Sequence, residues 1–301
     1  MLDEYLWCQV SRISPEAPVP VCAVSSTTHV LGGAANVAAN ILALGSVPIL
    51  VGVVGDDQGA EKLLKLAESK KINTSGLLTV VKRPTSVKTR IVAHHQHVVR
   101  VDHETCEEIA MADQNRVFDA VKSEIGTAKA LVLSDYSKGV LTGELTQRLI
   151  KLAVENKVPV LVDPKGDDPH KYKGATTMTP NFSEFQIFAK TKFSDEAKIA
   201  AFGQKLIQEL GLQALLVTRS EKGMSLLSAS EKHDIPTRAV AVYDITGAGD
   251  TVLAAFAVAI ADGLNYLTAA QFANYAAGVV VAKVGTATTT LAEIAQVLDH
   301  A

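Results

Sequence analysis

The sequence predicts an α/β protein with a mostly parallel β-sheet sandwiched between helices and a small β lid. Short apolar runs alternate with helical patterns along most of the chain. The runs are continuously apolar, which is typical of strands that crossover helices bury on both faces. A length of 301 residues with 48% hydrophobic and 20% charged residues suits an ordinary globular protein. We therefore expect a single domain over residues 1–301.

The predicted elements follow one another in a regular order. The candidate strands are Pro48–Val53, Ala130–Ser134, Val158–Asp163, Thr176–Met178, Gln213–Thr218 and Met224–Leu227. The candidate helices are Ala34–Leu44, Glu61–Lys70, Gln114–Ile125, Leu145–Glu155, Lys198–Leu210, Asp250–Ala261, Thr268–Val284 and Leu291–Leu298. Ligands of such sheets bind beyond the carboxyl ends of the strands, so the loops that follow the strands hold the candidate site.

Two stretches depart from this order. Val19–Ser25 alternates weakly, and Ser86–Ala93 followed by His97–His103 predicts two strands around the turn His94-His95-Gln96. Alternation favours a small antiparallel piece with one polar face. We expect segments of about 5–30 and 84–103 to form a lid over the site. Because exposed strand edges pair readily, a homodimer through this lid is expected.

The first residues are unusual for an open parallel sheet. Met1-Leu2-Asp3 is expected in the loop that follows a strand, yet no strand precedes it in this sequence. The sheet is therefore expected to lack one of its strands at this position. This leaves open a catalytically impaired protein that still binds nucleotide.

Composition excludes several classes of function. The formal charge of −3 and the pI near 6.2 leave no basic face of the kind that nucleic acid requires. The longest apolar helical run, Val252–Ala261, is too short to insert across a membrane. No leader resembles a signal peptide, so a cytoplasmic location is expected. Three cysteines at no metal spacing are expected to stay reduced.

The run Asp244-Ile245-Thr246-Gly247-Ala248-Gly249-Asp250-Thr251 is the most informative motif. It predicts a glycine turn that opens a helix, with a carboxylate in the first turn. Glycines let backbone N–H groups approach a ligand, and a helix N-terminus attracts anions. Asp250 is expected to stay ionised and to accept a proton beside a bound phosphate chain. The combination predicts phosphoryl transfer.

Motifs near the N-terminus allow two interpretations each. Gly32-Gly33-Ala34-Ala35-Asn36 either brings backbone and an amide against a hydroxyl-rich ligand or forms a turn before a closely packed helix. Asp3 either accepts hydrogen bonds from sugar hydroxyls or is solvated surface. The loop Ser134–Gly139 is interpreted as a capped turn, although it follows a predicted strand.

Three later motifs are also ambiguous. Lys165 follows a predicted strand, where it would neutralise phosphate charge, unless it is simply exposed. Asn181-Phe182-Ser183-Glu184 either holds the water shell of Mg²⁺ or forms a helix-capping box, and the local pattern favours the cap. The loop from Thr218 and Arg219 to Gly223 either borders a nucleotide or is a polar hairpin loop.

The ordered set of motifs resembles the ribokinase family of carbohydrate kinases, also called the phosphofructokinase-B family. The first and second signatures are similar to Gly32-Gly33-x-x-Asn36 and to residues 244–251, and Asn181-x-x-Glu184 lies between them in the family order. The resemblance covers essentially the whole chain and implies a ribokinase-like fold. Within the family, segments at 11–20, 134–139, 163–166 and 216–221 resemble the D-glycero-β-D-manno-heptose 7-phosphate kinases.

This resemblance implies an ATP-dependent kinase that phosphorylates the anomeric hydroxyl of the heptose 7-phosphate, a precursor of the lipopolysaccharide inner core. Kinases for another sugar or sugar phosphate remain the alternative. The resemblance implies that Asp250 is the base and that the backbone of Gly247, Ala248 and Gly249 binds the anion. It implies that ATP is bound by Asn181, Phe182, Ser183, Glu184, Lys165, Thr218, Arg219 and Gly223, that Glu184 holds Mg²⁺ through water, and that K⁺ lies near Asp244 and Thr246. The sugar hydroxyls are then bound by Asp3, Gly32, Gly33 and Asn36, and the substrate phosphate by Lys88, Arg90 and Arg100.

Overall fold

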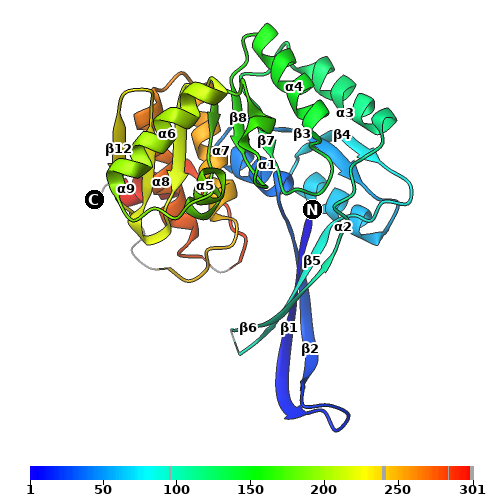
Figure 1. Ribbon diagram of the computed structural model, residues 1–301. Helices are drawn as coiled ribbons and strands as arrows, with labels where there is room; N and C mark the ends of the chain where they lie inside the picture. Colours follow the sequence, from blue (N-terminus) through cyan, green and yellow to red (C-terminus); the bar gives the residue numbers. More distant parts are fainter. Residues whose placement is uncertain (95, 239–241, 284, 299–301) are drawn as a thin grey trace.

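A six-stranded sheet forms the centre of the main body (Figure 1). The computed structural model describes residues 1–94, 96–238, 242–283 and 285–298. The strand order is β12-β11-β10-β9-β8-β7, with β7 to β10 parallel and β11 and β12 antiparallel. The strands are β7 (Leu131–Ser134), β8 (Val160–Asp163), β9 (Thr177–Met178), β10 (Ala214–Thr218), β11 (Met224–Leu227) and β12 (Lys232–Ile235).

Helices cover both faces of this sheet. They are α1 (Ala34–Ala43), α3 (Met111–Glu124), α4 (Gly143–Glu155), α5 (Phe182–Ala189), α6 (Glu196–Leu210), α7 (Ala248–Ala261), α8 (Tyr266–Val280) and α9 (Leu291–Leu298). Helix α2 (Gln58–Ser69) packs elsewhere, beside the first four strands of the chain, and η1 (Pro169–Tyr172) and η2 (Ser220–Lys222) are short 3₁₀ turns.

Alternation along the strands divides the core into two layers. In β8, Val160 and Val162 join the layer of α3, α4 and α6, whereas Leu161 joins the layer of α1, α7 and α8. Successive side chains of a strand point to opposite faces, so a strand covered on both sides must be apolar throughout. All three side chains are 0% exposed. The predicted fold class is thereby confirmed.

A second, two-stranded sheet stands beside the first. Its parallel strands, β3 (Ile49–Val54) and β4 (Asn73–Thr79), are joined through α2. No hydrogen-bonded ladder joins β3 to β7 in the part of the chain that the structure describes.

A long β arm projects from the body (Figure 1). The arm is a four-stranded sheet in the order β2-β1-β5-β6, in which β1 is parallel to β5 and antiparallel to β2. Its strands are β1 (Leu2–Ile13), β2 (Pro20–Leu31), β5 (Val87–Ala93) and β6 (Gln96–His103). At its base, Leu2 and Leu31 are buried in the core. The remainder extends beyond the helices.

The structure corrects several expectations about elements. Leu2 and Asp3 lie in β1 rather than in a loop, because they pair with β2 and β5, whose partners are distant in sequence. The weakly alternating segment continues as β2 to Leu31. Strands β4 and β12 were not predicted, because their largely polar sequences lack the apolar run used to identify strands. The helix predicted to end at Val284 ends as α8 at Val280; residues 284 and 95, the latter in the predicted turn, lie outside the described residues.

Candidate active site

Asp250 lies in the first turn of α7, where two side chains hold its carboxylate. The helix opens at Gly247, as the motif predicts, and Asp250 is 4% exposed. Asn36 Nδ2 donates a 2.8 Å hydrogen bond to Asp250 Oδ2, and Tyr136 Oη donates one of 2.8 Å to Oδ1. Each oxygen therefore has a defined orientation toward the space in front of the helix.

A buried polar chain fixes the amide of Asn36. Asn40, one turn further along α1, donates to Asn36 Oδ1 at 3.3 Å and accepts from Thr251 Oγ1 at 3.1 Å. Because Asn36 Oδ1 is the acceptor there, its NH₂ group must face Asp250. Two successive residues of α7, Asp250 and Thr251, are thus tied to α1.

Burial changes the protonation of Asp250. Removal from water raises the pKa of this carboxyl from 3.8 to about 6, although the hydrogen bonds from Asn36 and Tyr136 act in the opposite direction. The carboxylate predominates at neutral pH and titrates near pH 6. This is the range that suits a general base.

Two glycines allow the signature motifs to touch. A Cβ atom on Gly247 would stand 2.9 Å from Asn36 Nδ2, and the residue has a φ of +80°. A Cβ on Gly32 would stand 2.4 Å from Asp3 Oδ2. Contacts below 3 Å leave no room for a side chain, so close approach rather than a flexible turn explains both positions.

The predicted sugar-binding residues converge on one place. Asp3 in β1 is 5% exposed and accepts a 2.5 Å hydrogen bond from Arg90 Nη1 in β5. The Met1 amino group is also buried, which lowers its pKa to about 6 although Asp3 and Asp250 act to raise it. Gly33 precedes α1 with a φ of +56°. Carboxylates, an amide and a cation therefore surround the approach to Asp250.

A cavity of about 180 Å³ lies where the parallel strands β7 to β10 end. This is the sheet edge at which ligands were expected. Its lining brings together five predicted residues and four others: Lys165, Asn181, Glu184, Thr218 and Gly249, with Asp135, Tyr136, Asp163 and Thr179.

Asn181 and Glu184 form the capping box that the local pattern favours. Asn181 Oδ1 accepts from the Glu184 backbone N–H, and Glu184 Oε2 accepts from the Asn181 backbone N–H, both at 2.9 Å. Glu184 Oε1 also accepts from Lys165 Nζ at 2.7 Å. The cap does not remove these residues from the site, because both still line the cavity.

Asp163 supplies a second carboxyl in this cavity. Burial, with Asp250 and Glu184 nearby, raises the pKa of Asp163 well above its usual value. Carboxylate oxygens are the ligands that Mg²⁺ prefers, and it usually keeps several waters. Asp163 and Glu184 therefore fit a largely hydrated Mg²⁺ ion. Within the described ranges, no group of three or more His, Cys, Asp or Glu residues could hold a metal.

Side-chain contacts of Arg219 and backbone contacts of Gly223 hold the loop after β10 in place. The Arg219 guanidinium is paired with Glu196 at 2.5 and 2.9 Å and lies over the Phe182 ring, 5.2 Å from its centre. Gly223, with a φ of +78°, packs against the backbone of Ile235. Neither Arg219 nor Gly223 lines the 180 Å³ cavity, nor do Phe182 and Ser183. Their role toward the nucleotide stays a prediction.

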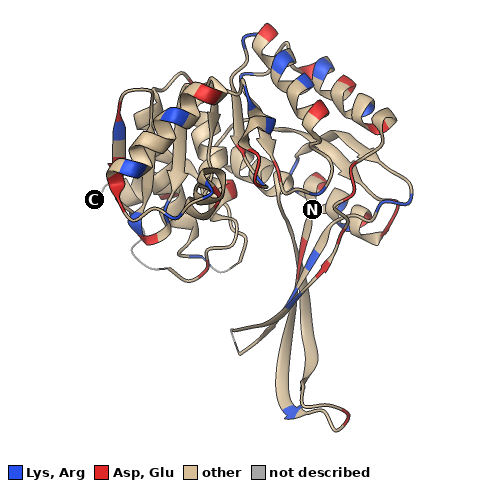
Figure 2. Cartoon of the chain, in the orientation of Figure 1, with Lys and Arg blue, Asp and Glu red and all other residues tan. Residues whose placement is uncertain are grey.

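Charges gather where the arm joins the body, while most of the arm beyond is uncharged (Figure 2). Lys88 pairs with Asp102 at 2.8 Å and with Glu104 at 3.0 Å. Arg100, opposite Arg90 in the β5–β6 register, turns to Asp102 and is 56% exposed along its side chain. Among the three predicted phosphate ligands, Arg90 forms an ion pair with another predicted site residue, Asp3.

Asp244 closes a loop next to the α7 motif. Its carboxylate accepts backbone N–H groups from Thr246 at 2.9 Å and from Gly285 at 3.0 Å. The two predicted K⁺ residues are thus neighbours. An ionised carboxylate in this loop also suits a cation, and the K⁺ assignment stays a prediction.

Sequence reasoning missed Tyr136 and Asp163 as site residues. Both follow or end predicted strands, and that position was the available signal. The loop of Tyr136 was interpreted as a capped turn, yet its hydroxyl reaches a residue 114 positions away. Sequence spacing alone does not give such a contact.

Comparisons with known proteins agree with this geometry. The sequence profile described as pfkB family carbohydrate kinase matches residues 4–293. The bifunctional protein HldE of Geobacter sulfurreducens is 43% identical over 98% of this chain and 60% of its own length. HldE of Klebsiella pneumoniae strain 342 is 46% identical over 98% of this chain and 61% of its own length. The chain therefore spans about three-fifths of these curated relatives.

Solved structures share the fold at lower identity. Ribokinase of Arabidopsis thaliana complexed with ribose and ATP has a TM-score of 0.78 and 20% identity over 99% of this chain and 95% of its own. Phosphofructokinase-2 of Escherichia coli in complex with potassium has a TM-score of 0.80 and 16% identity over 99% and 96%. No described helix is both long and apolar enough to cross a membrane. With the profile covering nearly all of its length, the chain belongs to the pfkB family of carbohydrate kinases.

Proposed function

We propose that this sugar kinase transfers the γ-phosphoryl group of ATP to the anomeric hydroxyl of D-glycero-β-D-manno-heptose 7-phosphate. The observation that carries the chemistry is the buried Asp250 carboxylate, held by Asn36 and Tyr136 at the N-terminus of α7. The choice of sugar is supported by the segments that resemble heptose 7-phosphate kinases and by the HldE relatives. The activity of the rest of those longer relatives is not proposed for this chain.

In this mechanism the Asp250 carboxylate takes the proton of the anomeric hydroxyl. The hydroxyl oxygen bonds to the γ-phosphorus as the bond from that phosphorus to the β,γ-bridging oxygen breaks, and ADP leaves. A positioned base contributes about 10²–10⁴-fold to the rate. The backbone N–H groups of Gly247, Ala248 and Gly249 would stabilise the transferred charge, for which the Ala248 N–H would leave its 3.2 Å hydrogen bond to Ile245 O. Such electrostatic stabilisation is the larger contribution in phosphoryl transfer.

Cations would neutralise the phosphates. Glu184 and Asp163 would hold Mg²⁺ mainly through water, and the ion would neutralise charge on the phosphate chain. Lys165 lies on the same cavity and supports the same role. We assign K⁺ to the loop of Asp244 and Thr246, and dependence of kcat on added K⁺ over Li⁺ tests that assignment.

The substrate 7-phosphate is assigned to the cations at the base of the arm. Arg90 is favoured because it lies beside Asp3, a predicted sugar-binding residue, and because arginine matches phosphate oxygens in pairs, although phosphate would compete with the Asp3 carboxylate for it. Lys88 and Arg100 are engaged by Asp102 and Glu104, so phosphate would have to compete with those carboxylates.

A homodimer through the arm is part of the proposal. Every residue of β6 is exposed, and Val98, Val99 and Val101 are 42%, 47% and 54% exposed. A second copy laid on this face would cover these valines and the free strand edge. Light scattering should give twice the chain mass, and Val99→Lys with Val101→Lys should give a monomer. A monomeric parent protein would refute the dimer.

The decisive experiment measures ADP formation with a panel of acceptors. Heptose 7-phosphate, fructose 6-phosphate and ribose are compared at equal concentration, and ³¹P NMR identifies the product. The proposal expects a 1,7-bisphosphate and the highest kcat/KM with the heptose. Preference for another acceptor would leave a kinase with a different substrate. Nucleotide binding without turnover would favour the catalytically impaired alternative.

A further inference from the structure

Asp135, the residue after β7, is a buried carboxylate with no part in the proposed transfer. It is 4% exposed and precedes Tyr136, whose hydroxyl orients Asp250. Its backbone N–H donates to Asp163 O at 3.0 Å, which continues the hydrogen bonding between β7 and β8 past the end of β7. A buried charge is costly unless it is paired, so its partners indicate what it does.

One oxygen of Asp135 shapes the loop that carries Tyr136. Asp135 Oδ1 accepts the backbone N–H of Ser137 at 2.7 Å. Ser137 has a φ of +51°, a left-handed conformation that is unfavourable for a residue with a Cβ atom. A carboxylate that bonds to the backbone two residues ahead is one of the local contacts that hold such a turn. Asp135 therefore fixes the backbone on both sides of Tyr136.

The other oxygen joins this loop to the loop after β8. Asp135 Oδ2 accepts from Tyr172 Oη in η1 at 2.7 Å and from Lys171 Nζ at 2.5 Å. Tyr172 Oη in turn accepts the backbone N–H of Lys165 at 3.0 Å. A single phenol hydroxyl thus connects two loops of the site. One carries Tyr136, which reaches the base, and the other carries Lys165, which lines the 180 Å³ cavity.

The hydroxyl proton of Tyr172 belongs to the bond with Asp135. Lys165 O is a second acceptor at 3.0 Å, but the carboxylate is closer and charged, which makes it the stronger partner. Burial and the neighbouring charge of Asp135 raise the pKa of Tyr172, so the hydroxyl keeps its proton. Tyr172 is 0% exposed and does not line the 180 Å³ cavity. It can therefore influence the reaction only through the loops that it joins.

We propose that Asp135 and Tyr172 are positioning residues for phosphoryl transfer. Together they hold the hydroxyl of Tyr136 within reach of the base and fix its loop against the loop of Lys165. The inference rests on the proposed role of Asp250 as that base. Neither residue needs to contact the sugar, because both act through Tyr136. A displacement of about 1 Å is enough to weaken the effect of a positioned group.

Tyr172→Phe tests the proposal, because it removes only a hydroxyl and changes no charge near the base. The phenyl ring keeps its packing in the core. The other groups whose charge acts on Asp250 are Asp3 in β1, Asp163 in β8 and the Met1 amino group, and all three are unaltered. A change in the titration of Asp250 would therefore come from the position of its hydrogen-bond donor.

Carboxyl ¹³C NMR of protein labelled at aspartate measures this titration, and the signal that is absent from Asp250→Asn assigns it. The pKa of Asp250 should rise in Tyr136→Phe by up to about one unit, because one hydrogen bond to the carboxylate is lost. It should rise in Tyr172→Phe by no more than that. The titration needs no turnover, so its result stands whichever sugar is the acceptor.

A double variant and a matched control separate positioning from general destabilisation. If Tyr172 acts through Tyr136, the two substitutions combined should shift the pKa no further than Tyr136→Phe alone. Tyr266→Phe on α8 removes a hydroxyl that bonds to Gln213, and it should leave the pKa of Asp250 and kcat unchanged.

Hydrogen exchange in the unaltered protein provides a measurement that needs no variant. The Ser137 and Lys165 amides should exchange as slowly as those of β7 and β8, because buried partners hold both. Fast exchange at either amide would overturn the proposal. So would an unshifted pKa of Asp250 in Tyr172→Phe, or shifts that add in the double variant.

Discussion

Replacement of Asp250 by asparagine should lower kcat by orders of magnitude and stabilise the fold at the same time. The carboxyl is 4% exposed, and burial raises its pKa from 3.8 to about 6. That difference corresponds to about 3 kcal/mol of folding free energy, an upper bound on what the buried charge costs above pH 6. The substituted amide would retain both contacts, because its oxygen accepts from Asn36 and its NH₂ group donates to Tyr136 Oη.

The pH dependence of the stability gain shows whether the buried charge of Asp250 is its cause. A carboxyl with a raised folded-state pKa contributes stability below its unfolded value, 3.8, and loses it as pH rises through about 6. The stability gained by Asp250→Asn should therefore be full above pH 6 and vanish near pH 4. Urea unfolding at pH 4, 5, 6 and 7.5 measures it. The wild-type kcat/KM should fall below pH 6, where the base is protonated.

Asp262→Asn is the matched control, at the other end of the same helix. Its side chain is 63% exposed, and the substitution should leave kcat and stability nearly unchanged. Loss of a positioned base should lower kcat by about 10²–10⁴-fold in Asp250→Asn, while the affinity for ATP is largely kept. Near-normal kcat would refute the assignment of the base. A change in stability that is the same at every pH would refute burial as the origin of the raised pKa.

Three further substitutions test the surroundings of the base. Tyr136→Phe removes a donor to the carboxylate, so the acid limb of the pH profile of kcat/KM should move to higher pH. Gly247→Ala should lower the free energy of unfolding, measured in urea, by about 1–3 kcal/mol. Gly45→Ala should lower it less, because Gly45 has a similar positive φ but a Cβ atom there would meet nothing within 4 Å. Arg90→Ala leaves Asp3 buried without its partner, which should cost about 3–5 kcal/mol and raise KM for the sugar phosphate; an unchanged KM would exclude Arg90 from phosphate binding.

Local sequence patterns predicted the elements that depend on neighbouring residues or on burial of both faces. Strand β8 is apolar throughout because both faces are covered, and α5 begins at a capping box that four residues encode. Strand β1 was missed because its pairing partners are β2 and β5, and no pattern within Leu2–Ile13 identifies them. Strand β12 was missed because an edge strand needs no apolar run.

The site residues differ in the same way, because some depend on a local motif and others on contacts between distant elements. Gly247 and Asp250 were found because a helix N-terminus with glycines is a local device for anions. Tyr136 and Asn40 were not, because their roles depend on where β7 and α1 pack against α7. The raised pKa of Asp250 was not predicted either, because the burial that causes it is a property of the assembled fold.

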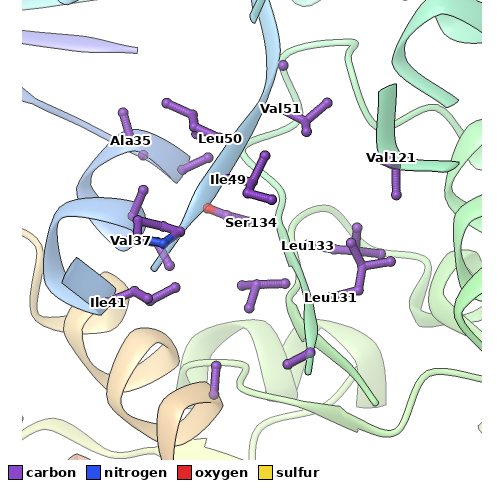
Figure 3. A pocket seen from close by; sticks show the side chains of 18 of the residues that line it. Ala35, Val37, Ile41, Ile49, Leu50, Val51, Val121, Leu131, Leu133 and Ser134 are labelled. Atoms are coloured by element: carbon purple, nitrogen blue, oxygen red, sulfur yellow. The ribbon is translucent and has the colours of Figure 1, made fainter. Parts of the chain in front are cut away.

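A larger cavity, of about 940 Å³, lies between β3 and β7 (Figure 3) and shares a wall with the cavity of the site. Asp135 and Tyr136 line both the 180 Å³ cavity and the 940 Å³ cavity, directly after β7. Tyr136 orients one oxygen of Asp250, so its hydroxyl must stay within hydrogen-bond reach during the reaction. A substitution that shifts the loop after β7 would therefore disturb the proposed base without any contact with the substrate.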